Sequence, residues 1–226
     1  MRQYVADRVF SAVIFDLDGV IADSHPIHEI AWRRLLEEQA RGYPPEFVSS
    51  VIREGKTRPE ILQTFFPDVP VEKARALGER KDALYYENIE RCAPIPGVLS
   101  WIERLRQLSI PTAVATSASR TRALRTLQAF GIESSFRAVV TASEVPLGKP
   151  DPALFLAAAV ALPVAPECAL VVEDSLAGLQ AGRSAGMSLL LYSPSRDPQL
   201  FALSPDFVVD TFNEISLEPV MKRFAR

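Results

Sequence analysis

Carboxylate side chains that could hold a divalent cation follow two apolar stretches of the chain. Asp16 comes directly after one stretch, with Asp18 two residues later, and Glu173 and Asp174 follow another. Four carboxylates brought together would repel one another, and some would take up protons unless a cation lay between them. A site made only of oxygen ligands favours Mg²⁺ over zinc. The sequence therefore predicts a magnesium site.

Two further segments carry groups that could bind an anion. Thr116 and Ser117 end a third apolar stretch, and Lys149 follows a fourth within the segment GKPDP. Mg²⁺ keeps part of its coordination shell for waters or phosphate oxygens, so a magnesium site recruits phosphate. Lys149 and Thr116 would then offer charge and hydrogen bonds to the remaining phosphoryl oxygens. A cation site and an anion site are expected side by side.

The aspartates of the first segment suit covalent phosphoryl transfer. Aspartate is a known nucleophile that forms an aspartyl-phosphate. Asp18 could carry the proton, first to the leaving oxygen and then from water. Structural roles are the alternative reading of the same residues: a strand end and turn cap for Asp16 and Asp18, a strand-end hydroxyl for Thr116, a solvated loop lysine for Lys149, and a helix cap for Glu173 and Asp174.

The elements expected to position these residues form a parallel α/β sheet covered on both faces. Short apolar runs alternate with helical patterns, as in buried parallel strands joined by helices. The ligand crevice of such a sheet lies beyond the carboxyl ends of its strands, where the polar segments fall. Strands are expected at Val9–Phe15, Thr112–Thr116, Ala138–Thr141, Ala169–Val172, Ser188–Tyr192 and Phe207–Val209, and helices at Val98–Leu108, Ser119–Phe130, Pro152–Leu162 and Leu176–Ala185.

The stretch from Ser24 to about Ala93 interrupts this alternation, because it contains helical patterns and no convincing strand. One of its helices is expected to begin at Thr57, which can cap it, and another to run from Val71 to Arg91. A helical part of a single core is one interpretation. An inserted domain is favoured, because the stretch separates the first strand from the rest. The predicted division is a core of residues 1–23 and 94–226 and a helical domain of residues 24–93.

The composition of the chain argues against a nucleic-acid partner and against a membrane helix. The chain has 226 residues, with 25 Lys and Arg against 28 Asp and Glu, a formal net charge of −3. This balance gives no sequence-wide basic surface for nucleic acid. No apolar tract reaches the ~20 residues of a membrane helix, and the cysteines, Cys92 and Cys168, lack the spacing of a zinc site or disulfide framework. A cytoplasmic protein is expected; the oligomeric state is left open, with a monomer plausible.

The four polar segments, taken in order, resemble the motifs of the haloacid dehalogenase superfamily. The matching segments are DLDGV from Asp16, VATS ending at Ser117, GKPDP from Gly148 and VEDSLAG from Val172. The chain is similar to the phosphatase and β-phosphoglucomutase branch, which carries a helical cap between the first and second motifs. The resemblance implies a Rossmann-like core, and a cap that decides the substrate at residues 24–93.

The resemblance also implies a role for each residue. Asp16 would be the nucleophile and a Mg²⁺ ligand, and Asp18 the general acid/base with its main-chain carbonyl on the metal. Asp174 would bind the metal, with Glu173 helping directly or through water. The groups that would hold the phosphoryl group are Thr116 and Lys149, with a contact from Ser117.

Three residues of the helical stretch resemble substrate contacts of the mutase. His28 is similar to a histidine that the mutase places over its sugar, and Arg58 and Lys81 fall where such caps present basic groups. A helix-start or solvated histidine and two surface charges are the alternatives.

The expected function is a Mg²⁺-dependent phosphatase of small phosphorylated metabolites, sugar phosphates above all, acting through an aspartyl-phosphate. A β-phosphoglucomutase is the second candidate, because the core residues are common to both. A dehalogenase would not need Asp18, the metal or the Glu173–Asp174 pair. A non-catalytic metabolite-binding protein should have lost a chemical group, and Asp16, Asp18, Lys149 and Asp174 are all present.

Overall fold

The computed structural model describes residues 10–53 and 58–213, which fall into two compact units. One unit comprises residues 10–22 and 94–213, and the other comprises residues 23–53 and 58–93. The chain passes between them within two short paired strands, β2 (Ala22–Asp23) and β3 (Ala93–Pro94). No helix in the described ranges combines the length and apolarity needed to cross a bilayer.

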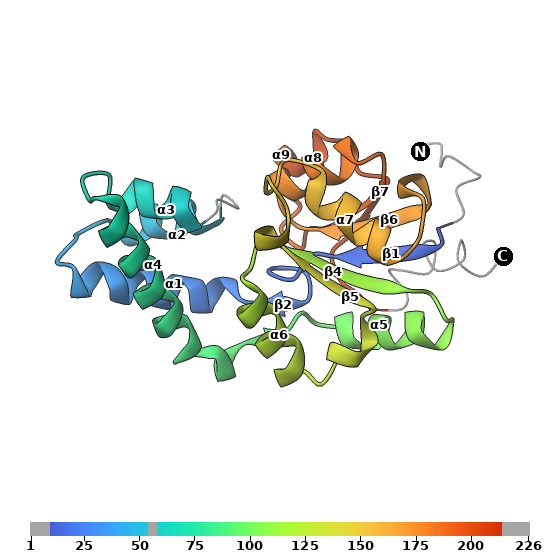
Figure 1. Cartoon of the computed structure of the whole chain (residues 1–226), viewed down its shortest axis with the longest axis horizontal. Helices are drawn as coiled ribbons and strands as arrows, with labels where there is room; N and C mark the ends of the chain where they lie inside the picture. Colours follow the sequence, from blue (N-terminus) through green and yellow to red (C-terminus); the bar gives the residue numbers. More distant parts are fainter. Residues whose placement is uncertain (1–9, 54–57, 214–226) are drawn as a thin grey trace. The chain divides into compact units, whose positions relative to one another are not determined.

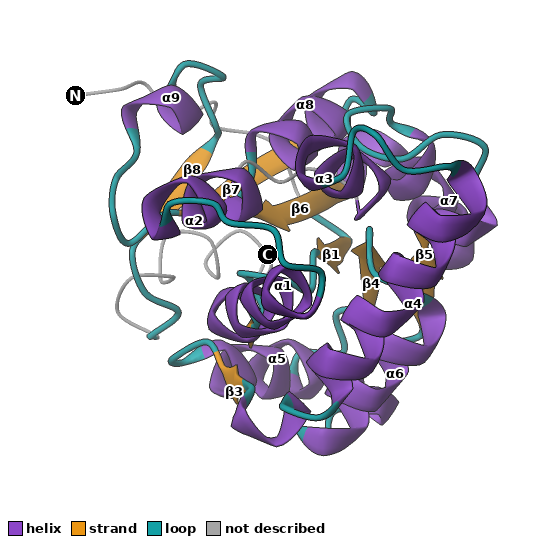
Figure 2. Ribbon diagram, turned by 90° about the vertical axis from the view of Figure 1, so that its left-hand side faces the viewer, coloured by secondary structure: helices purple, strands orange, loops and turns teal. Residues whose placement is uncertain are grey.

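The larger unit is built on a six-stranded sheet in the order β5-β4-β1-β6-β7-β8. Every neighbouring pair is parallel, and β1 lies between β4 and β6 (Figure 2). The chain therefore builds outward from β1 on one side and then returns to its other side. The strands are β1 (Ala12–Phe15), β4 (Thr112–Thr116), β5 (Ala138–Thr141), β6 (Ala169–Glu173), β7 (Ser188–Tyr192) and β8 (Phe207–Val209).

Helices cover both faces of this sheet (Figure 1). Ala12 and Ile14 of β1 share a buried apolar cluster with Leu154 and Leu179 of two helices. Phe15 faces the other way, where its ring lies 5.1 Å from that of Trp101. Burial on both faces explains why the interior positions of the central strands are apolar. The helices of this unit are α5 (Val98–Gln107), α6 (Arg120–Ala129), α7 (Ala153–Ala161), α8 (Leu176–Ser184) and α9 (Pro198–Phe201). The predicted fold class is confirmed.

Small residues bring α8 close to the sheet. A Cβ on Gly182 would lie 2.6 Å from Cδ2 of Leu189 on β7, which is shorter than a carbon–carbon contact allows. Gly182 therefore permits the close packing of α8 against the sheet.

The smaller unit is helical. Its helices are α1 (His25–Glu38), α2 (Pro45–Arg53), α3 (Arg58–Phe65) and α4 (Val71–Tyr86), followed by a 3-10 turn at Ile89–Arg91. They share a core that includes Trp32, Leu35, Phe65 and Leu84. The spacing of Trp32 and Leu35 on α1 accounts for their common face.

Three sequence expectations differ from the structure or fall outside its described part. The helix predicted over Val71–Arg91 ends at Tyr86, and the side chain of Asn88 donates a hydrogen bond to the carbonyl of Leu84 in its last turn. This bond competes with helix continuation, as asparagine side chains do near helix ends. Thr57, the expected cap of α3, and Val9, the expected start of the first strand, lie outside the described residues. Within the described residues the first strand begins at Ala12, after Phe10 and Ser11.

Gly97→Ala should destabilise the protein more than Gly131→Ala. Both glycines have a positive φ, +85° and +70°. At either position an alanine therefore lowers the free energy of unfolding by about 1 kcal/mol through backbone strain. At Gly97 the new Cβ would also lie 2.8 Å from the carbonyl carbon of Phe212, whereas nothing lies within 4 Å at Gly131. The clash should add about 1–3 kcal/mol to the loss in free energy of unfolding. Urea unfolding of both variants measures the difference, and equal losses would contradict this packing of Gly97.

Candidate active site

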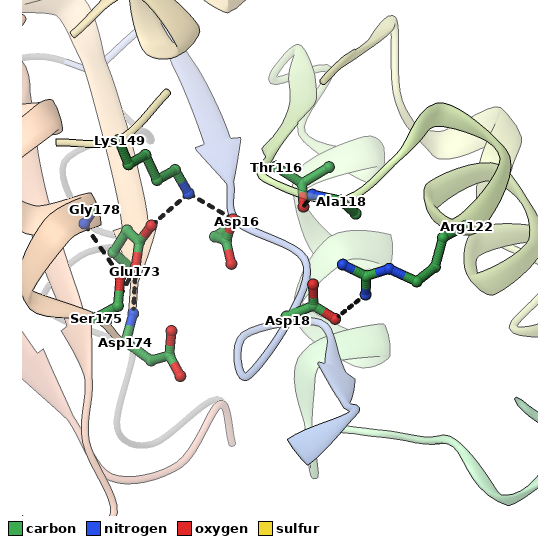
Figure 3. Close-up of polar contacts among 10 residues, drawn as sticks. All are labelled: Asp16, Asp18, Thr116, Ala118, Arg122, Lys149, Glu173, Asp174, Ser175 and Gly178. Carbon is green, nitrogen blue, oxygen red and sulfur yellow. Dashed lines mark hydrogen bonds and ion pairs between the residues drawn. The ribbon is translucent and has the colours of Figure 1, made fainter. Parts of the chain in front are cut away.

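The loop after β1 turns its two aspartates toward different partners (Figure 3). The backbone N–H of Asp16 donates to the carbonyl of Val172 on β6 over 3.0 Å, which fixes the start of the loop. Gly19, at φ +79°, allows the tight turn in which its N–H donates to the carbonyl of Ala22. Leu17, between the aspartates, is fully buried. The loop therefore holds both carboxylates at defined points.

Lys149 joins the first and last polar segments. Its Nζ lies 2.6 Å from Oδ1 of Asp16 and 2.6 Å from Oε1 of Glu173. The three side chains are only 6%, 10% and 0% exposed. Burial would lower the pKa of Lys149, but the charges of Asp16 and Glu173 outweigh it and raise that pKa above its usual value. Lys149 is therefore a buried cation shared by two carboxylates.

The second oxygen of Glu173 is held by the start of α8. Oε2 accepts hydrogen bonds of 2.9 Å from the backbone N–H groups of Asp174 and Ser175 and from the Ser175 hydroxyl. Ser175 also caps α8 by accepting from the N–H of Gly178 over 3.1 Å. A Cβ on Gly178 would lie 1.7 Å from Oε1 of Glu173. Only glycine leaves room for this carboxylate.

Asp16, Glu173 and Asp174 form a group that suits a hard cation. Each offers a carboxylate oxygen, and these oxygens all lie within 4.8 Å of one another. Burial raises the pKa of Asp16 to about 7, although the charge of Lys149 lowers it. Burial and the negative charges of Glu173 and Asp16 also raise the pKa of Asp174 well above its usual range. Carboxyls that resist ionisation in this way gain from a bound cation, so the residues present fit Mg²⁺.

Thr116 lies at the carboxyl end of β4, on the other side of Asp16 from Lys149 (Figure 3). It is fully buried, and its Oγ1 accepts a hydrogen bond of 3.0 Å from the N–H of Ala118. That bond uses an oxygen lone pair, so it does not consume the hydroxyl proton. Ser117, the next residue, is exposed.

His28, Lys81 and Arg58 come together within the helical unit. Nζ of Lys81 lies 2.8 Å from Nδ1 of His28 and 3.6 Å from a carboxylate oxygen of Asp82. Arg58 forms an ion pair with the same Asp82. Lys81 is 3% exposed and lies 5.2 Å from the ring of Tyr85, so it is not a surface charge. Arg58 is exposed.

Arg122 is a site residue that sequence reasoning missed. Its Nη1 donates to Oδ1 of Asp18 over 2.6 Å. The available signal was its place in the first turn of the helix expected after the VATS segment. That signal alone does not tell which loop the side chain meets.

Comparison with known proteins shows the family of the chain. A model of the haloacid dehalogenase-like hydrolases matches residues 10–186. The chain belongs to this family. The resemblance to the haloacid dehalogenase superfamily is thereby confirmed.

Relatives of this chain include phosphatases and phosphomutases. A phosphorylated carbohydrates phosphatase of Thermotoga maritima is 33% identical over 187 residues, which cover 78% of this chain and 82% of the relative. A β-phosphoglucomutase of Bacillus subtilis is 30% identical over 216 residues, 92% of each chain. The solved structure of a β-phosphoglucomutase from Clostridium difficile is 26% identical, has a TM-score of 0.82, and covers 96% of this chain and 97% of its own.

Gly178→Ala should weaken cation binding. The new Cβ would occupy the place of the Glu173 carboxylate, which must then leave Lys149 or the start of α8. Loss of the contacts that hold a metal ligand in place lowers metal affinity by about 10-fold or more. Calorimetric titration with Mg²⁺ measures the loss. Gly42→Ala is the control, because nothing lies within 4 Å of its added Cβ, and equal affinities of the two variants would contradict this packing.

Mg²⁺ should stabilise the protein more at about pH 8 than at about pH 5.5. Because the pKa of Asp16 rises from 3.8 to about 7 on folding, the metal-free folded protein binds more protons here than the unfolded chain. This group therefore lowers the free energy of unfolding as pH rises between those values. Mg²⁺ binds the ionised carboxylate and competes with the proton. Melting temperatures with Mg²⁺ and with EDTA test this, and an equal stabilisation at both pH values would contradict it.

Proposed function

We propose that this protein is a Mg²⁺-dependent phosphatase of small phosphorylated metabolites, sugar phosphates above all, acting through an aspartyl-phosphate on Asp16. The observation that carries the proposal is the contact of Lys149 with both Asp16 and Glu173, beside the carboxylate of Asp174. It joins a nucleophile, a cation and a candidate metal site at one edge of the sheet. The sugar phosphatases among the relatives support the substrate class.

The metal would be held by Asp16, Asp174 and Glu173, with the main-chain carbonyl of Asp18. When bound, it would offset negative charge and polarise the phosphoryl group. The charge on Lys149 would serve the same end from the protein side. Lys149 and Thr116, with a contact from Ser117, would bind the phosphoryl oxygens.

The chain's own residues would carry two successive transfers. In the first, a carboxylate oxygen of Asp16 bonds to phosphorus, the bond from phosphorus to the ester oxygen breaks, and Asp18 gives that oxygen its proton. In the second, a water oxygen bonds to phosphorus, Asp18 takes the proton of the water, and the bond between phosphorus and Asp16 breaks. Orthophosphate leaves, and both aspartates return to their starting states.

The helical unit, residues 24–93, would act as the cap that selects the substrate. Its candidate contacts are His28, Lys81 and Arg58, which Asp82 links into one polar group. Lys81 is buried against aromatic rings, and a buried ammonium gains from any hydroxyl or phosphate oxygen that approaches it. A small-molecule substrate and a cytoplasmic location complete the proposal, with neither nucleic acid nor a membrane as partner.

A β-phosphoglucomutase is the second candidate. The contact between His28 and Lys81 and the similarity to the Bacillus subtilis β-phosphoglucomutase favour it. A mutase returns the phosphoryl group to a second sugar hydroxyl, whereas a phosphatase passes it to water. The products therefore distinguish the two functions.

The test is turnover of a panel of phosphorylated metabolites with Mg²⁺, including β-glucose 1-phosphate with and without a bisphosphorylated sugar. Release of orthophosphate is the expected result, and an isomerised sugar phosphate would favour the mutase. Asp16→Asn should lower turnover at least about 1,000-fold, because it removes the nucleophile. Asp210→Asn is the control, because Asp210 is exposed in an ion pair with Arg196. Full turnover by Asp16→Asn would end the covalent mechanism.

A further inference from the structure

An ion pair joins the first turn of α6 to the loop after β1 (Figure 3). Nη1 of Arg122 lies 2.6 Å from Oδ1 of Asp18, and the two side chains are 11% and 23% exposed. Withdrawing two charges from water costs desolvation that their attraction does little more than offset. The pair is therefore expected to add little to the stability of the fold. Because one of its members, Asp18, is the candidate proton carrier, Arg122 is placed to act in the reaction.

The backbone of Arg122 is held from both sides. Its N–H donates to the side-chain oxygen of Ser119, which caps α6, over 3.4 Å. Its carbonyl accepts a hydrogen bond of 3.0 Å from the hydroxyl of Thr126, one turn later. The guanidinium therefore reaches Asp18 from a fixed point, so that few side-chain conformations maintain the contact.

Arg122 and Lys149 draw the two aspartates in different directions. Asp16 contacts Lys149 and belongs to the acidic group with Glu173 and Asp174. Asp18 turns toward α6 instead (Figure 3). A carboxylate close to that acidic group would be repelled by it, and the cation on α6 offers Asp18 a favourable place beside it. The ion pair fixes the direction from which the Asp18 carboxylate can approach the oxygens around phosphorus, and Asp18 takes up a proton before it acts as the acid of the first transfer.

We propose that Arg122 is a positioning residue for Asp18: it orients the carboxyl that carries the proton and does not itself bind the substrate. The inference rests on the proposed function, in which Asp18 gives a proton to the leaving oxygen and later takes one from water. Acid–base catalysis of this kind contributes about 10²–10⁴-fold, and a misplaced acid loses part of that factor. Loss of Arg122 should therefore lower the rate of the chemical steps.

The test compares two esters in Arg122→Met, Asp18→Asn and the double variant. An alkyl phosphate from the metabolite panel needs a proton on its leaving oxygen, whereas the nitrophenolate of p-nitrophenyl phosphate leaves without one. Arg122→Met should lower kcat/KM about 10- to 100-fold for the alkyl phosphate and much less for p-nitrophenyl phosphate. In the Asp18→Asn background the same substitution should change kcat/KM less than about threefold, because the residue it positions is already lost.

The controls separate positioning from folding. Arg120→Met removes another ion-paired arginine of the same helix, whose partner is Glu144, and should leave kcat/KM unchanged. Arg122→Lys keeps the charge, and we expect it to recover part of the activity; it also replaces Arg122→Met if the latter does not fold. Melting temperatures of all the variants are measured alongside.

Other outcomes overturn the inference. If the effects of the two substitutions on log kcat/KM add in the double variant, Arg122 is a substrate-binding residue. If Arg122→Met lowers kcat/KM equally for the two esters, Arg122 has a structural role only. Absence of turnover by the wild type would instead overturn the proposed function. Crystal structures of the metal-free wild type and of Arg122→Met then test the inference without activity: the Asp18 carboxylate should move when Arg122 is lost, and an unchanged carboxylate would refute the positioning role.

Discussion

The site depends on one buried lysine shared by two buried carboxylates. Asp16 and Glu173 are almost inaccessible to water, and each lies 2.6 Å from Nζ of Lys149. Without a cation at this point, both would pay the cost of burying a negative charge. Lys149 opposes the effect of burial on the pKa of Asp16, which keeps this proposed nucleophile closer to its ionised form. The same charge would attract the phosphoryl group that the nucleophile attacks.

The parallel sheet is what brings these groups together. Asp16 follows β1, Thr116 ends β4 and Glu173 ends β6, and β1 is the neighbour of both other strands. Since all three strands run in one direction, their carboxyl ends meet at one edge. The buried apolar strands make the sheet rigid, so the polar residues at their carboxyl ends are held in fixed positions. This division explains why residues more than a hundred positions apart form a single site.

The sheet and its helices could be predicted because buried strands appear in the sequence as short apolar runs and helices as apolar residues at helical spacing. Because burial sets how neighbouring parallel strands align, it also brings the four polar segments at their carboxyl ends to one edge of the sheet. Other features have no local pattern. Glu173 ends β6 itself rather than following it, held there by the N–H groups of Asp174 and Ser175. The fit of its carboxylate over Gly178, and the reach of Arg122 to Asp18, depend on tertiary packing, which sequence spacing does not encode.

Asp16 and Asp18 are suited to the two different roles proposed for them because each contacts its own cation. A nucleophile must keep a free carboxylate beside phosphorus, whereas a proton carrier must reach the oxygens around it. Lys149 draws Asp16 toward Glu173 and Asp174, and Arg122 draws Asp18 toward α6. Leu17 between them is fully buried, so exchanging the two directions would require the loop to leave its core contacts. The proposed separation of roles would therefore follow from the burial of Leu17 and from the two cations, Lys149 and Arg122, that hold the aspartates on either side of it.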